Sequence, residues 1–338
     1  MADDSPDPSQ SESGSARFRR TLLVRGLLGV VVTGTLVLLL VRYVEWPRFV
    51  GLLGQGRADL LGLALLLYLL LYLARTWRFW LLVPRTPLRT MFAITCVHNF
   101  LLRLLPMRTG EISFAILLRR AGAGGLTRGM ISLFLVRLLD GGMVVLIFAS
   151  TLLVARGQFR AEQAPSLIAA GAIFVAGLLA VIYFRRLLRL LLLLLSGSLR
   201  LVRLDTRPGV ARALRRLSDE IDAFSSTPRR AVLGAGAATA VQWLISFALI
   251  YLVMRAFSVK VSPSQAVLGG TASVVSAFLP IGGIGTFGTL EAGWTLGFVL
   301  VGLSTSLAAH SAFAYSMVTF VYAGVLGLFG WLALRGRR

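Results

Sequence analysis

The sequence predicts an all-α protein that crosses a membrane several times. Apolar residues make up 57% of the 338-residue chain and charged residues 14%, a balance that a water-soluble protein cannot bury, because surface grows with size. Apolar stretches of about twenty residues recur along the chain, each long enough for a hydrocarbon core ~30 Å thick. Because backbone polar groups in lipid must pair internally, these stretches are predicted to be helices; the short alternating segments typical of a β-barrel are absent.

About six of these stretches are long enough to be complete spans. The first is too long for the core of a signal peptide, and no small-residue cleavage site follows it, so we expect a retained anchor. The predicted spans lie near 22–42, 59–80, 129–154, 166–184, 231–254 and 310–333.

Two other apolar regions, 90–118 and 264–303, are interrupted by proline and glycine. These residues end helices because proline lacks an N–H donor and glycine frees the backbone. Each arm has about 15 residues and covers ~22 Å, short of a full crossing. We therefore predict two re-entrant helical hairpins rather than ordinary short helices. The predicted apices are Pro106, Gly110, Pro280, Gly282, Gly283 and Gly285.

The net charge of +21 does not indicate nucleic-acid binding, because the basic residues lie between apolar segments, where they are typical of topology signals. Most are arginines on one predicted side of the membrane, which also holds both ends of the first broken region. This bias predicts cytoplasmic N- and C-termini in a plasma (inner) membrane. The basic residues expected on the external side are Arg42, Arg48, Arg57, Arg156, Arg160, Arg255 and Lys260.

The predicted organisation is a disordered tail over 1–18, a single membrane domain over 19–334 and a basic tail over 335–338. Its two halves, about 19–156 and 164–334, each run span, span, hairpin, span, but in opposite orientation. Inverted repeats of this kind build transporter sites near the bilayer midplane from broken helices. We therefore expect an inverted-repeat arrangement with a site between the hairpins.

A strongly basic segment, 185–230, separates the spans of the second half. Arg215 with Asp219 and Arg216 with Glu220 have the spacing of helical ion pairs. We expect an interfacial helix on the inner leaflet, where each basic group gains ~1 kcal/mol near anionic lipid. An ordinary positively charged loop is the alternative.

Ionised side chains inside apolar segments cost at least ~2.5–3.5 kcal/mol, so they usually face a cavity or a partner. The pairs Arg108/Glu111 and Arg137/Asp140 are three residues apart, so each pair can neutralise itself on one helix face. Alternatively, the arginines bind a phosphate and the acids bind a cationic headgroup or exchange a proton. The candidates in these segments are Asn99, Arg103, Arg108, Glu111, Arg137, Asp140 and Glu291.

Glu291 has no basic neighbour at helical spacing. We expect it to be protonated or bound across the hairpins, for example to Arg108. Arg75 and Arg78 lie near the inner end of a span, where they either anchor the helix at the interface or capture an incoming phosphate. The predicted substrate-binding residues are Arg108, Glu111, Arg137, Asp140, Glu291, Asn99, Arg75 and Arg78.

Several chemistries are not expected. Cys96 is the single cysteine, and with only two histidines, His98 and His310, neither a zinc nor a haem site is predicted. Lys260, the single lysine, is followed by Val261, so the chain lacks a P-loop. We expect no cofactor, no metal and no catalytic residue.

Three sequence pieces together resemble a known family, the lysylphosphatidylglycerol synthase transmembrane region family, also called the flippase-like domain family. They are the run from Asn99 to Glu111 with its Leu-Pro break, the Arg137-Leu-Leu-Asp140 motif, and Leu279-Pro280-Ile-Gly-Gly with Glu291. The resemblance covers most of 20–335. It implies a lipid flippase-like fold, which in the aminoacyl-phosphatidylglycerol proteins moves the modified lipid outward. The cytosolic aminoacyl-transferase domain of those proteins is not expected here.

The leading hypothesis is therefore a transporter that moves a phosphate-bearing lipid, whether a phospholipid, an aminoacylated lipid or a polyprenyl-linked lipid, between leaflets. Its partners would be membrane lipids, anionic or phosphate-bearing. One alternative is a non-transporting membrane partner of a lipid or cell-envelope biosynthesis enzyme, docking through 185–230. Another is a membrane-embedded transferase with Asp140 or Glu291 as its base. The sequence allows a homo-oligomer, because Gly293 and Gly297 are as suitable for contacts in a dimer as for packing within one chain.

Overall fold

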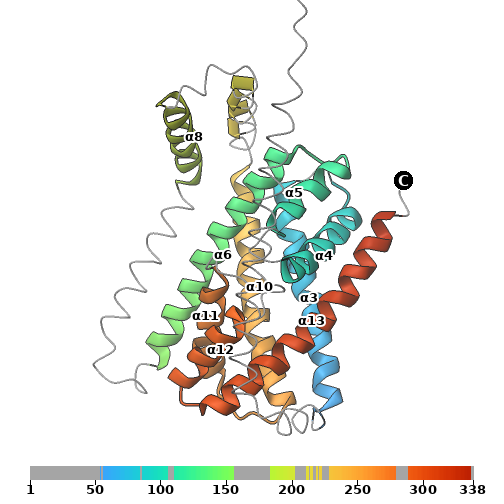
Figure 1. The fold of residues 1–338 in the computed structure, drawn as a ribbon, viewed down its shortest axis with the longest axis vertical. Coiled ribbons are helices and arrows are strands. Elements are labelled where there is room, and N and C mark those ends of the chain that lie inside the picture. The colour runs from blue at the N-terminus through green and yellow to red at the C-terminus, as the bar shows by residue number, and fades with distance from the viewer. Residues whose placement is uncertain are drawn as a thin grey trace, which may run out of the picture.

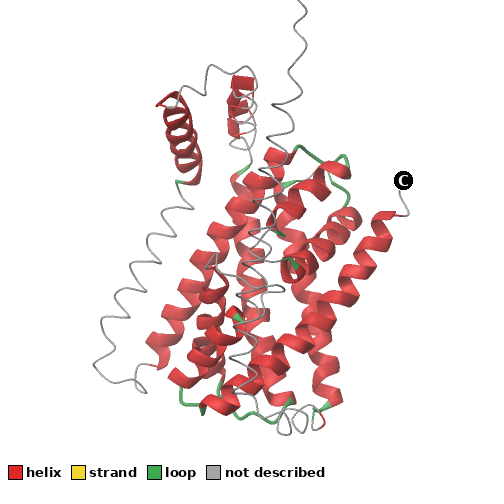
Figure 2. Ribbon diagram, viewed as in Figure 1, coloured by secondary structure: helices red, strands yellow, loops and turns green. Residues whose placement is uncertain are grey.

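Every regular element in the described part of the computed structural model is a helix (Figure 2). The tails predicted at 1–18 and after Arg335, and the span predicted near 22–42, lie outside that part, as does nearly all of the span predicted near 166–184. The structure describes residues 54, 56–83, 86–105, 110–155, 183–201, 211–212, 214–215, 218–219, 221–222, 228–278 and 288–335.

Four described helices are long and apolar enough to cross a membrane. They coincide with the spans predicted near 59–80, 129–154, 231–254 and 310–333, so the prediction of a multi-pass helical membrane protein is confirmed. These helices are α3 (Ala58–Leu82), α6 (Leu126–Ala155), α10 (Arg229–Ala256) and α13 (Thr305–Arg335).

Both broken regions form pairs of short helices. The longest of these helices has 17 residues and covers ~25 Å, less than a hydrocarbon core. The two members of each pair pack against each other. The predicted apices other than Gly110 lie outside the described residues. The helices are α4 (Leu88–Leu104), α5 (Glu111–Arg120), α11 (Pro263–Phe278) and α12 (Thr289–Leu300).

Small residues allow each pair to close. A Cβ on Gly110 would lie 2.5 Å from the carbonyl oxygen of Leu101, so the chain returns directly against the end of α4. In the second pair, a Cβ on Gly297 would lie 2.7 Å from the Cβ of Ala272. Gly297 therefore serves the internal contact between α11 and α12, one of the two roles that the sequence left open.

The long helices hold the two pairs at opposite ends of the bundle, as Figure 1 shows. α3 and α10 run antiparallel, because the backbone N–H of Arg57 bonds to the oxygen of Ala256 at 3.0 Å at one end and Leu81 packs on Gly234 toward the other. α13 passes both pairs. α12 packs against its first half and α4 against its second.

Helix neighbours repeat between the two halves of the chain. α5 packs against α6 as α12 packs against α13, and α3 packs against α4 as α10 packs against α11. Each pair of short helices also contacts the last helix of the other half, α4 with α13 and α11 with α6. The halves therefore interlock rather than form separate bundles.

Basic residues differ between the ends of the bundle. The end where α3 finishes and α6 begins carries seven described arginines, and α8 (Phe184–Leu201) lies beyond it (Figure 1). Within the predicted interfacial segment, the described ion pair joins Arg189 to Asp222 at 3.6 Å; Arg216 and Glu220 lie outside the described residues. The seven arginines are Arg89, Arg119, Arg120, Arg128, Arg229, Arg230 and Arg335, against Arg57, Arg255 and Lys260 at the opposite end.

Candidate functional site

A polar cavity of about 230 Å³ lies within the bundle. Residues from α3, α4, α6, α10, α11, α12 and α13 line it, so both short-helix pairs contribute to its wall. Five of the predicted substrate-binding residues meet here although they come from three different helices. The charged and amide residues in the lining are Arg75, Arg78, Asn99, Arg103, Arg137, Asp140 and Gln242.

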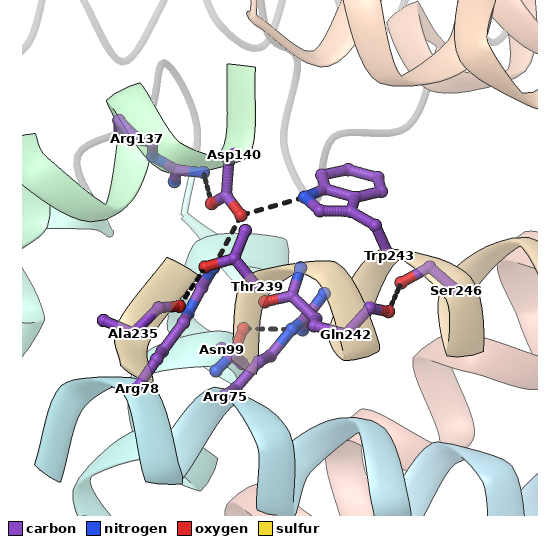
Figure 3. A network of polar contacts seen from close by, with 10 residues as sticks. All are labelled: Arg75, Arg78, Asn99, Arg137, Asp140, Ala235, Thr239, Gln242, Trp243 and Ser246. Atoms are coloured by element: carbon purple, nitrogen blue, oxygen red, sulfur yellow. Dashed lines mark hydrogen bonds and ion pairs between the residues drawn. The ribbon is translucent and has the colours of Figure 1, made fainter. Parts of the chain in front are cut away.

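Asp140, near the middle of α6, joins three helices. Its Oδ1 accepts hydrogen bonds from Arg78 Nη1 at 2.5 Å and from Trp243 Nε1 at 3.0 Å (Figure 3). Asp140 is 2% exposed and Arg78 5%, so Arg78 does not anchor α3 at the surface. A buried carboxylate is tolerated here because a cation and a second donor replace its lost hydration.

Arg137 lies between two carboxylates. Its Nη2 donates to Glu111 Oε1 at 3.0 Å, whereas its Nη1 is 4.0 Å from Asp140 Oδ2. Arg137 and Asp140 thus form the predicted ion pair on one helix face, but the pair is not self-contained, because each residue binds more closely to a residue of another helix. Arg108, the partner predicted for Glu111, lies outside the described residues.

Arg75 and Arg103 bind neutral partners. Arg75 Nη1 donates to Asn99 Oδ1 at 2.8 Å, and Arg103 Nη1 donates to Thr319 Oγ1 at 3.1 Å. The described part of the chain places no carboxylate within ion-pair distance of either guanidinium. Both therefore present positive charge to the cavity without an ion-pair partner in this part of the chain, although Glu291 acts on Arg103 electrostatically from beyond ion-pair distance.

Within the described structure, three buried polar atoms of the lining have no hydrogen-bond partner: Nε of Arg75, Nε of Arg78 and Oε1 of Gln242. Gln242 is only 2% exposed, and Figure 3 shows its amide beside Arg75 and Asn99. Buried polar atoms are nearly always paired, so unpaired ones at a cavity point to a ligand. The sequence analysis missed Gln242; its signal was an amide in an otherwise apolar span.

Glu291 lies outside the cavity lining and is 1% exposed. It accepts hydrogen bonds from Ser316 Oγ and from the backbone N–H of Gly288, the latter at 2.6 Å. Its hydrogen bonds among the described residues thus go to α13 and to Gly288, and Arg103 at the end of α4, in the other pair of short helices, acts on it electrostatically. Arg108, the partner expected across the hairpins, lies outside the described residues. Gly288 has a φ of 95°, which favours glycine.

The middle of α13 holds both short-helix pairs. Ser316 binds Glu291 at the start of α12, and Thr319, three residues later, binds Arg103 at the end of α4. Tyr68 of α3 also donates to the backbone oxygen of Thr319, at 3.2 Å. The inner ends of the two pairs therefore meet within one turn of a single helix.

The two histidines have ordinary hydrogen bonds. His98 Nδ1 lies 2.9 Å from Ser113 Oγ, and His310 Nδ1 lies 2.5 Å from the backbone oxygen of Ser306. Over the described ranges, no group of three His, Cys, Asp or Glu residues is placed to hold a metal ion.

The fold and the site define a multi-pass helical membrane protein with a buried, arginine-lined cavity. Residues 26–327 match the family described as the lysylphosphatidylglycerol synthase TM region, and the chain belongs to that family. The resemblance seen in the sequence is thereby confirmed. No curated protein matches the chain.

Proposed function

We propose that this protein lets a phosphate-bearing lipid move between the two leaflets of the plasma membrane. The observation that carries the proposal is the cavity, where four arginines line the protein interior between two pairs of short helices. Guanidinium groups bind phosphate oxygens through paired, charge-assisted hydrogen bonds. The cavity would replace the hydration that a phosphate loses as it passes through the membrane, while the acyl chains stay in lipid.

In this proposal, α4–α5 and α11–α12 are re-entrant hairpins of an inverted repeat. Their arms are too short to cross, they lie at opposite ends of the bundle, and the inner ends of α4 and α12 bind the middle of α13. Irregular backbone at membrane depth is tolerated where protein or a cavity surrounds it. The excess of arginine at one end of the bundle supports a cytoplasmic location for that end and for both termini.

A second, apolar groove gives the lipid tails a place. It has a volume of about 650 Å³ and lies between α3, α4 and α13. Thr76 and Trp77 of α3 line it, whereas the neighbouring Arg75 and Arg78 line the polar cavity. A lipid at α3 would thus find an apolar surface and a cationic surface on adjoining faces of one helix.

The proposed function has no chemical step and uses no catalytic residue. Asp140, one base considered for a membrane-embedded transferase, already accepts hydrogen bonds from Arg78 and Trp243. Those bonds give Asp140 a structural role that joins α3, α6 and α10. A gradient of lipid or of protons would drive the movement.

The test is reconstitution of the purified full-length protein in liposomes that contain a fluorescent phospholipid. External dithionite bleaches only the outer leaflet, so a faster second phase of bleaching reports movement between leaflets. We expect faster movement than in empty liposomes, and a reduction of about tenfold for Arg75→Gln or Arg103→Gln. Arg255→Gln, at an exposed position, is the matched control. If no phosphate-bearing lipid moves faster than in empty liposomes, the proposal fails.

The alternative, a non-transporting partner of a lipid or cell-envelope enzyme, is favoured by one observation. α8 exposes leucines such as Leu193 and Leu194 beside Arg186 and Arg189, beyond the end of the bundle. This surface suits an anionic leaflet or a docking enzyme. If removal of 185–230 abolishes function in cells while Arg103→Gln is tolerated, the docking alternative replaces transport.

A further inference from the structure

We infer that the cavity takes a lipid headgroup that is net anionic, carries a hydrogen-bond donor such as a hydroxyl, and has no cationic group. The inference rests on the proposed function and names its substrate class. It separates an anionic phosphodiester lipid from zwitterionic and aminoacylated lipids, all of which carry a phosphate.

The first step concerns the partners of three carboxylates on the described membrane helices, Asp140, Glu111 and Glu291. Asp140 binds Arg78, and Glu111 binds Arg137. Glu291 binds Ser316 and the backbone of Gly288, outside the cavity lining. In the described structure, each of these three carboxylates therefore already has a cation or a hydrogen-bond donor beside it, and only Asp140 lies in the cavity lining.

The second step is the charge that remains. Arg75 and Arg103 both line the cavity, and their hydrogen bonds go to the neutral groups of Asn99 and Thr319. Among the described residues neither has a carboxylate within ion-pair distance, although Glu291 acts on Arg103 electrostatically from farther away. With four arginines and one carboxylate in the lining, the cavity wall attracts an anion and repels a cation. An aminoacyl or ammonium headgroup would bring positive charge to this wall, whereas an anionic phosphodiester would neutralise it.

The third step is the unpartnered acceptor. Oε1 of Gln242 is buried on α10 in the cavity lining, and the described residues offer it no hydrogen-bond donor. The unpartnered Nε atoms of Arg75 and Arg78 are donors. A headgroup that satisfies all three atoms accepts at its phosphate and donates from another group. Since the donor must not be cationic, a hydroxyl group fits.

The experiment compares lipids with identical acyl chains in liposomes that contain the full-length protein. Phosphatidylglycerol is anionic with hydroxyl donors, phosphatidylethanol is anionic without one, phosphatidylcholine is zwitterionic, and lysyl-phosphatidylglycerol is cationic. We expect phosphatidylglycerol to move fastest, phosphatidylethanol about threefold to tenfold more slowly, and the other two at least tenfold more slowly. Soluble glycerol phosphate, added in excess, should not abolish the movement of phosphatidylglycerol.

Two substitutions of Gln242 test whether the site requires a hydrogen-bond donor on the lipid headgroup. Gln242→Leu should remove the advantage of phosphatidylglycerol over phosphatidylethanol but keep the preference of both over phosphatidylcholine. Gln242→Glu adds a carboxylate to the cavity wall beside Arg75, and it should raise the relative rate of lysyl-phosphatidylglycerol. Val241→Leu, at an exposed position one residue away, is the control and should change neither ratio.

The two proposals fail differently. Equal rates for all four lipids, or fastest movement of the lysyl lipid, would overturn the headgroup inference and leave transport standing. Movement of none of them would overturn the proposed function itself. If glycerol phosphate binds and blocks the site as well as the lipid does, with no selectivity among lipids, the site recognises a soluble anion and the headgroup inference also falls.

Discussion

Arg78 and Asp140 form a buried ion pair, with side-chain exposures of 7% and 3%. Neither charge would be stable alone in this position, because desolvation strongly disfavours an unpaired ion. Their pairing ties α3 to α6, and Trp243 adds α10 through the same carboxylate. At the scale of the residue, the site is thus a set of paired ions that supports two arginines without acidic partners, Arg75 and Arg103.

Arg78→Gln should destabilise the protein by ~3–5 kcal/mol, because it leaves a buried carboxylate without its cation. The double variant Arg78→Gln/Asp140→Asn should lose less than the sum of the two single losses, since neither charge remains. Thermal unfolding of the purified protein in detergent measures both effects. Arg57→Gln is the control, because the Arg57–Asp59 pair is about 60% exposed and such pairs contribute ~0–1 kcal/mol. Additive losses in the double variant would contradict the pairing.

Close helix contacts in this protein depend on small residues. Gly297 and Gly293 face α11, Gly129 faces Ala115 of α5, and Gly330 faces Ala93 of α4. Without a hydrophobic force between helices in lipid, such contacts gain stability from close packing. At the scale of the element, the short helices are therefore stabilised by packing along their sides, although each is too short to cross the hydrocarbon core by itself.

Gly297→Leu should separate α11 from α12, because even a Cβ at this position lies 2.7 Å from the Cβ of Ala272. Overpacking typically costs ~1–3 kcal/mol, so we expect a lower unfolding temperature together with slower lipid movement. Gly142→Leu is the matched control, since a Cβ there meets nothing within 4 Å. Equal unfolding temperatures for the two variants would show that the contact between α11 and α12 is not tight.

The whole molecule is built from two interlocking halves. Each pair of short helices packs against the last long helix of the other half, and the inner ends of both pairs bind α13 at Ser316 and Thr319. A movement of either pair relative to α13 would therefore change the wall of the cavity. This arrangement suits alternating exposure of one central site.

The proposed topology places the turn after α5 and the turn before α13 on opposite sides of the membrane. Both turns are exposed, and the native Cys96 is buried, so a new cysteine can be labelled selectively. A membrane-impermeant maleimide should label Ser304→Cys in intact cells but label Ala121→Cys, at an exposed position directly after α5, only after permeabilisation. Labelling of both from the same side would contradict the inverted arrangement.

The sequence predicted the bounds of the described membrane helices closely, because the features that define them depend on residues close together in the chain. Hydropathy and length identified α3, α6, α10 and α13, and proline and glycine located both breaks. Candidate site residues were found because charge in an apolar segment is costly wherever it occurs. Five of them, Arg75, Arg78, Asn99, Arg137 and Asp140, line one cavity.

By itself, the sequence determined that this is a helical membrane protein with costly charges at defined places, because both properties depend on neighbouring residues only. Tertiary structure alone decided which charges neutralise each other: Asp140 binds Arg78, 62 residues away, more closely than it binds Arg137 on its own helix. It also placed Arg75, Arg103 and Gln242 in the cavity lining with no ion-pair partner among the described residues. The physical reason is that a partner on another helix is set by packing, and distance along the chain carries no information about it.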